Sequence, residues 1–171
     1  VVIIQAHSDY LSTSEITAIS NYVTAGGKLI FSYWDLNNSP DLQAVVGVTN
    51  TISFTTPIDV SLWDATHAIF NSPNTIVSND LIVAGDNAGN DNGDRLEIAT
   101  DAIAVAGFTA SATTGEASIV LANDKLTIYH GFGGPDFNTT AFTNLVENEV
   151  AYLINRTLVS AQENNFASSL S

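Results

Sequence analysis

The chain of 171 residues contains no cysteine and no methionine, and it has only 4 lysine and arginine residues against 18 aspartate and glutamate residues. Without cysteine neither a disulfide nor a thiolate metal site can form, so the fold depends on its hydrophobic core. The formal net charge of −14 disfavours nucleic acid and anionic membrane surfaces as partners. No apolar run approaches the roughly 18 residues of a membrane span, so we expect no membrane insertion.

The residues that are present predict one domain with an uncharged polar surface. Hydrophobic residues make up 45% of the chain and charged residues only 13%, so the acidity reflects missing bases rather than surplus acids. Asn, Ser and Thr supply most of the polar surface, which is typical of a secreted prokaryotic protein and predicts an extracellular or cell-surface location. We expect a single domain over residues 1–158 and a flexible tail over residues 159–171.

The first 34 residues predict a strand, a helix and a second strand. Residues 1–6 (VVIIQA) are apolar on both faces, as in a central strand of a parallel sheet. Ser12 and Glu15 have capping-box spacing, and the helix over about residues 13–25 ends at Gly26-Gly27. Residues 28–34 (KLIFSYW) form the second buried strand. This order is the right-handed crossover of an α/β protein.

The remaining chain predicts a short helix within residues 39–47 and strands within residues 51–56, 95–110, 116–122 and 125–132. Asn123-Asp124 suits a tight turn, so the last two strands should form an antiparallel hairpin on a mostly parallel sheet. A final helix begins at Thr139 or Thr140. Its expected core stripe consists of Phe142, Leu145, Val146, Val150, Leu153 and Ile154.

Three segments together resemble the class I glutamine-amidotransferase-like superfamily of flavodoxin-like α/β domains. They are residues 1–35, in which a helix ends in Gly-Gly before an apolar strand, residues 67–74 (HAIFNSPN), and residues 126–134 (LTIYHGFGG) with the helix that follows. The resemblance covers residues 1–157 and implies a three-layer sandwich. In such domains a strand, a helix and a strand precede the segment that begins here, which implies either a missing upstream part or a sheet completed by another chain.

Catalytic members of that superfamily carry a cysteine on a sharp elbow after the strand that corresponds to residues 28–34, and this chain has none. Ser32 lies nearby, but "IFSYWD" contains no glycine to form an elbow. A hydrolase would need Ser32 as nucleophile, His130 as base and an acid such as Asp136. The resemblance therefore implies a degenerate, non-catalytic member.

Polar residues at the ends of the expected parallel strands form a second candidate site. His7 and Asp9 follow the first strand, Trp34 and Asp35 follow the second, and His130 ends the last. Ligands of open parallel sheets bind beyond the carboxyl ends of the strands, so these five residues predict a crevice for a carbohydrate or another small ligand. The His and Asp residues among them are also suitable metal ligands. The alternative is that they cap strand ends.

Four aromatic residues, Trp34, Trp63, Tyr33 and Phe70, offer a platform on which a sugar ring could stack. Aromatic residues beside strands are more often part of the core.

The loop at residues 85–94 (GDNAGNDNGD) is the strongest ion candidate. Asp86, Asp91 and Asp94 could hold calcium in an irregular oxygen cage. The strict EF-hand pattern fails, because aligning Gly93 with its glycine places alanines where both obligatory acids belong. The alternative is a solvated connection, since Asn and Gly favour turns without any metal.

Three classes of function stay open. The first is a non-catalytic structural or assembly module, whose partners are other copies of itself or other domains of a larger extracellular protein. The second is a carbohydrate or small-ligand binding domain at the strand-end crevice. The third is a hydrolase that uses Ser32 or a His/Asp metal site.

Overall fold

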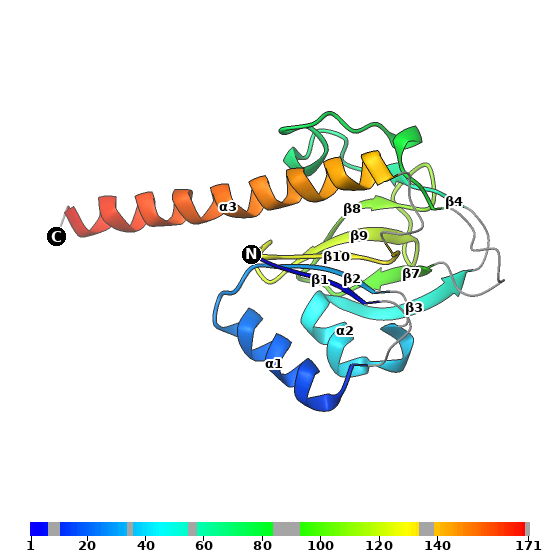
Figure 1. Cartoon of the computed structure of the whole chain (residues 1–171), viewed down its shortest axis with the longest axis horizontal. Coiled ribbons are helices and arrows are strands. Elements are labelled where there is room, and N and C mark those ends of the chain that lie inside the picture. Colours follow the sequence, from blue (N-terminus) through cyan, green and yellow to red (C-terminus); the bar gives the residue numbers. More distant parts are fainter. Residues whose placement is uncertain (7–10, 34–35, 55–57, 84–92, 134–138, 170–171) are drawn as a thin grey trace.

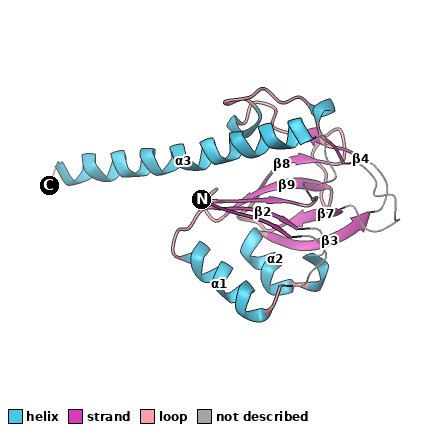
Figure 2. Cartoon of the chain, in the orientation of Figure 1, coloured by secondary structure: helices cyan, strands magenta, loops and turns pink. Residues whose placement is uncertain are grey.

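The protein is a three-layer α/β sandwich in which helices cover both faces of one main sheet (Figure 1). A computed structural model describes residues 1–6, 11–33, 36–54, 58–83, 93–133 and 139–169. Helices α1 (Thr13–Thr24) and α2 (Pro40–Val46) lie on one face of the sheet, and α3 (Thr139–Ser169) crosses the other (Figure 2). The α/β, flavodoxin-like fold class predicted from the sequence is confirmed.

The main sheet has eight strands. They are β1 (Val2–Ala6), β2 (Leu29–Tyr33), β3 (Val48–Phe54), β5 (Ser61–Leu62), β7 (Gly93–Ile98), β8 (Ile103–Gly107), β9 (Ala117–Ala122) and β10 (Thr127–His130). The order along the sheet is β1-β2-β10-β9-β7-β3, with β8 paired to β9 and β5 paired to β8. Two short strands, β4 (Ile58–Asp59) and β6 (Ile82–Val83), pair separately. Three 3-10 turns complete the structure: Leu36–Asn38, Ala68–Phe70 (η2) and Ser78–Asp80.

Strand β1 lies at the edge of the sheet, so the prediction of a central strand is wrong. It pairs in parallel with β2, which pairs in parallel with β10 on its other side. An apolar sequence is typical of a doubly covered strand, but here Val1, Val2 and Ile3 are 47%, 40% and 53% exposed. The apolar residues at the start of β1 therefore form a surface that the other described residues leave uncovered.

Antiparallel pairing extends beyond the predicted C-terminal hairpin. β9 and β10 form that hairpin, with Asn123, Asp124 and Lys125 at positive φ in its turn, as the sequence predicted. Residues 95–110 are not one strand, because the chain reverses between β7 and β8 through a turn in which Ala102 N–H donates to the carbonyl of Ala99. The reversal was missed because its turn, Thr100-Asp101, contains neither the glycine nor the proline that usually marks a turn.

The two N-terminal helices follow their predicted signals. Ser12 accepts from the backbone N–H of Glu15, whose carboxylate accepts in return from the Ser12 N–H, so the capping box is complete. Helix α2 begins at Pro40 and ends at Gly47, whose φ of 74° is the left-handed conformation that suits glycine.

Helix α3 is longer than the sequence predicted. Residues 159–169, expected to be a flexible tail, form its last turns and extend beyond the sheet (Figure 1). The segment contains no glycine or proline that would end a helix. None of the helices within the described residues has both the length and the hydropathy needed to cross a membrane.

A hydrophobic core lies on each face of the sheet. Side chains alternate along β2, so Leu29 and Phe31 pack towards α1 and α2, while Ile30 packs on the α3 side. Ser32 is also on the α3 side, since it borders the same pocket as Ile30. This alternation brings a polar residue of β2 under α3.

Candidate functional site

Most of the residues predicted for the strand-end crevice cannot be placed. His7, Asp9, Trp34, Asp35, Asp86, Asp91 and Asp136 all lie outside the described residues. Of the named candidates, His130 and Asp94 are described, together with Ser32, Trp63 and Phe70. Phe70 is fully buried in the core on the α3 side, and Trp63 borders a separate pocket.

His130 ends β10 and connects two other elements through its ring nitrogens. Its Nδ1 lies 2.7 Å from Oγ of Ser32 on β2, and its Nε2 lies 2.7 Å from Oε1 of Glu149 on α3. A neutral ring accommodates both bonds when the Ser32 hydroxyl donates to Nδ1 and Nε2–H donates to Glu149. The ring stacks on Phe132 at 5.1 Å and meets Phe142 edge-on. Serine, imidazole and carboxylate thus form one buried relay.

Ser32 is not on a nucleophile elbow. It lies within β2, one residue before the last residue of that strand, in register with Gln5 of β1 on one side and His130 of β10 on the other. A serine nucleophile usually sits on a tight turn after a strand, where nearby backbone N–H groups can stabilise an oxyanion. Ser32 is 3% exposed and borders a pocket of about 260 Å³ between the β1–β2 face and the start of α3.

Glu149 replaces the predicted acid as the third member of this relay. The sequence pointed to Asp136, and Glu149 was overlooked because it sits within a helix assumed to present only apolar residues to the core. It is fully buried, and its Oε2 has no hydrogen-bond partner among the described residues. The missed signal was its spacing, four residues after Leu145 and four before Leu153, both of which are buried.

The neighbouring Asn148 clamps α3 to the segment at residues 67–74. Its side-chain oxygen accepts from Asn74 N–H at 2.8 Å, and its amide nitrogen donates to the carbonyls of Ile69 and Asn74 at 2.9 and 2.8 Å. Asn148 is fully buried, yet its donors and its acceptor are all in use. The predicted core stripe needs one correction here, because Ile154 is exposed whereas Asn148 and Glu149 are buried.

His67 lies in the same segment and begins η2. Its Nδ1 accepts from Ile69 N–H at 3.4 Å, a bond that requires this nitrogen to be unprotonated. Partial burial lowers the pKa of His67 below its usual value, the charge of Asp64 opposes that shift, and Lys125 and Arg156 add to it.

Asp94 belongs to β7 rather than to an open loop. Its carboxylate is fully buried and accepts from the Ser53 hydroxyl at 2.7 Å and from Leu36 N–H at 3.2 Å. These bonds join β7, β3 and the turn after β2. Among the described residues no three His, Asp or Glu side chains come together as metal ligands. Calcium binding that uses Asp86 and Asp91 stays a prediction.

Comparison with known proteins supports the fold. No family model and no curated protein matches the chain. A ThuA-like protein from Bacteroides uniformis superposes with a TM-score of 0.54 at 14% identity, over 86% of this chain and 66% of the other. A cold-adapted β-galactosidase from Rahnella sp. R3 gives 0.58 at 14% identity, over 84% and 21%. A GMP synthase protein from Thermoplasma acidophilum gives 0.55 at 8% identity, over 86% and 68%.

These neighbours are similar to this chain in fold, and at such identities the likeness extends no further. The chain spans only about a fifth of the β-galactosidase and two thirds of the other two. The ThuA-like and GMP synthase structures are consistent with the glutamine-amidotransferase-like superfamily that the sequence resembles.

Proposed function

We propose that the chain is a non-catalytic assembly module of an extracellular or cell-surface protein, and that it joins a second copy of itself through the free edge of β1. The observation that carries this proposal is the exposure of Val1, Val2 and Ile3 along a strand that pairs only with β2 among the described residues. An open, apolar strand edge is a template for pairing with another strand, and soluble proteins usually protect such edges.

The opposite edge of the same sheet supports the choice of β1. Strand β3 forms that edge. Its polar residues Thr49, Asn50 and Ser53 lie on the same short strand as the exposed Ile52. The edge of β3 is therefore largely polar, whereas β1 has the sequence Val-Ile-Ile-Gln-Ala. Only the β1 edge would bury several apolar side chains on pairing.

Charge favours a second copy as the occupant. Two chains of net charge −14 repel each other, and the repulsion is smallest when they meet at a surface that carries no carboxylate. Residues 1–6 carry no ionisable side chain. Antiparallel pairing of β1 with β1 about a two-fold axis would present the same uncharged surface from both copies and continue the sheet across the dimer.

Light scattering of the purified chain tests this proposal. We expect a mass of about twice the 18.1 kDa of one chain. Ile3→Lys should weaken the dimer about 100-fold, because the two-fold axis places the change in the interface twice. Ile52→Lys is the matched control, since Ile52 is 54% exposed on the other edge and Ile3 is 53% exposed. A monomeric wild-type chain, or equal loss in both variants, would overturn the pairing of β1.

The same measurement in calcium and in a chelator tests the ion prediction. A calcium-dependent mass or melting temperature that Asp91→Asn abolishes would support a site at Asp86, Asp91 and Asp94. Identical behaviour in both buffers would count against it.

The relay of Ser32, His130 and Glu149 favours one alternative, a serine hydrolase, because hydroxyl, imidazole and carboxylate are linked at 2.7 Å spacings. Two facts weigh against it: Ser32 lies inside β2 rather than on a turn after it, and the residue is almost fully buried. A fluorophosphonate that labels the folded wild-type chain but not Ser32→Ala would establish the hydrolase. Absence of labelling, with the fold intact, would leave the relay a structural role.

A further inference from the structure

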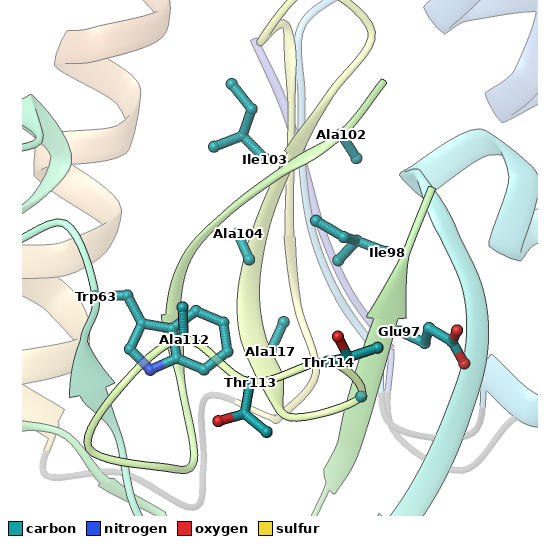
Figure 3. Close-up of a pocket in the computed structure, with 11 residues that line it drawn as sticks. Trp63, Glu97, Ile98, Ala102, Ile103, Ala104, Ala112, Thr113, Thr114 and Ala117 are labelled. Atoms are coloured by element: carbon teal, nitrogen blue, oxygen red, sulfur yellow. The ribbon is translucent and has the colours of Figure 1, made fainter. Parts of the chain in front are cut away.

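A pocket of about 500 Å³ lies where β7 and β8 separate, beside Trp63 (Figure 3). These two strands follow each other in the chain, yet each pairs with β9. β7 shares a single register pair with β9, Leu96 with Ala117, and Glu97 and Ile98 beyond it pair only with β3. The sheet opens between the two strands at this point. The small side chains of Ala104 and Ala117 line the floor of the opening and leave it unfilled.

Trp63 is held firmly at the side of this pocket. Its indole N–H donates to the carbonyl of Thr109 at 2.8 Å, so the polar group of the ring already has a partner. The ring lies against Gly107, where an added Cβ would overlap it. The close approach of the ring to β8 therefore requires glycine, and it presents the indole as a fixed apolar wall.

The other lining residues combine aliphatic walls with a few polar groups. Ile98 and Ile103 add apolar surface, and the remaining space exists because the other residues are small: Ala102, Ala104, Ala112, Gly115 and Ala117. The polar residues of the lining are Thr113, Thr114 and Glu97, and Glu97 is the one ionisable residue among the described residues that line the pocket. The carboxylate of Glu97 points away from Trp63 (Figure 3).

From this arrangement we propose that the pocket binds a neutral saccharide unit, independently of the β1 edge. Its volume is within the range of small-molecule sites, which are typically apolar with a few placed polar groups. The carbon faces of a sugar ring pack on an indole and on aliphatic walls, while its hydroxyls exchange hydrogen bonds with threonine.

The lining disfavours charged ligands. An anion would meet Glu97 in a chain of net charge −14. A quaternary cation is usually held by a cage of several aromatic rings, and Trp63 is the single aromatic residue among the described residues that border the pocket. A compact neutral molecule with both carbon faces and hydroxyls fits best.

Nuclear magnetic resonance titration of the full chain tests the saccharide site. The probes are the methyl glycosides of glucose, galactose, mannose and N-acetylglucosamine. The reporter is the indole N–H signal of Trp63, which is identified by its absence in Trp63→Phe. We expect at least one glycoside to shift this signal saturably. Ala104→Leu fills the pocket from its floor and should weaken binding by about tenfold or more.

Two further variants make the test specific. Ala110→Leu adds the same side chain at an exposed position that does not line the pocket, and it should bind as the wild type does. Glu97→Gln should change glycoside binding at most a few-fold, because the Glu97 side chain points away from Trp63 and a neutral ligand gains little from its charge. The proposal is overturned if none of the four glycosides shifts the signal, or if Ala104→Leu leaves binding unchanged. It is also overturned if tetramethylammonium binds instead and Glu97→Gln abolishes that binding.

Discussion

Replacing Glu149 should reveal what the buried relay contributes to stability. In Glu149→Ala the Nε2–H of His130 loses its acceptor in a site without water access, and the lost side chain leaves a cavity. An orphaned buried donor costs about 1–3 kcal/mol and the cavity adds to it, so we expect a loss of about 3–5 kcal/mol. Glu149→Gln keeps an oxygen for His130 but places an amide NH2 where Oε2 has no partner, so we expect about 1–2 kcal/mol.

The assay is urea unfolding, with the free energy taken from the midpoint at a constant slope. Glu147→Ala is the control on the same helix. Glu147 is exposed, and among the described residues its carboxylate accepts one hydrogen bond, from the side-chain amide of Asn74 at 3.0 Å, so its loss should cost about 0.5 kcal/mol.

If orphaned polar groups cause this loss of stability, an apolar version of the relay should avoid it. Ser32→Ala, His130→Phe and Glu149→Leu together remove every donor and acceptor of the relay, and the new phenyl ring would lie beside Phe132 and Phe142. This triple variant should recover to within about 2 kcal/mol of the wild type. If it is as unstable as Glu149→Ala, lost packing rather than unpaired polarity explains the effect, and the reasoning is refuted.

Three further predictions concern the surroundings of the two sites. Gly107→Ala should cost about 2–3 kcal/mol and displace Trp63, which a red-shifted tryptophan emission would report, whereas an unshifted spectrum would contradict the contact. Asn148→Ala should cost about 3 kcal/mol in urea unfolding, since it orphans Asn74 N–H and two carbonyls; a loss below about 1 kcal/mol would disprove the clamp. Burial lowers the pKa of His67 in the folded chain, so as the pH falls the unfolded chain binds a proton at this residue before the folded chain does. The contribution of His67 therefore makes stability rise with pH between the lowered and the ordinary pKa. His67→Asn, which keeps a capping oxygen, should flatten that rise in unfolding measurements from about pH 5 to about pH 8, and an unchanged slope would assign it to other groups.

Local signals predicted the elements well, and long-range placement was harder to predict. The capping box of Ser12 and Glu15 and the Asn123-Asp124 turn act within a few residues, so the sequence alone identified them. The position of β1 at the edge depends on which strands flank it, which its own residues do not encode. The same holds for the pocket beside Trp63, which exists because two strands separate and five small residues leave the space unfilled.

The buried polar residues of α3 explain why the predicted stripe was only partly correct. Helical spacing marks a face as buried, but it does not require every residue on that face to be apolar. By helical spacing, residues 148 and 149 lie on the buried face between Leu145 and Leu153. They were left out of the expected stripe because polar residues were assumed to be exposed.

Those two residues also give α3 a defined register on the sheet. The apolar residues of a long helix can pack in more than one register, since a shift by one turn replaces one aliphatic side chain with another. A shift of α3 by one turn would separate Asn148 from the carbonyls of Ile69 and Asn74, and Glu149 from His130. Each separation would leave buried polar groups unpaired, at about 1–3 kcal/mol apiece. The native register is therefore selected mainly by the cost of the alternatives, and it holds the start of α3 next to Ser32 and the exposed face of β1.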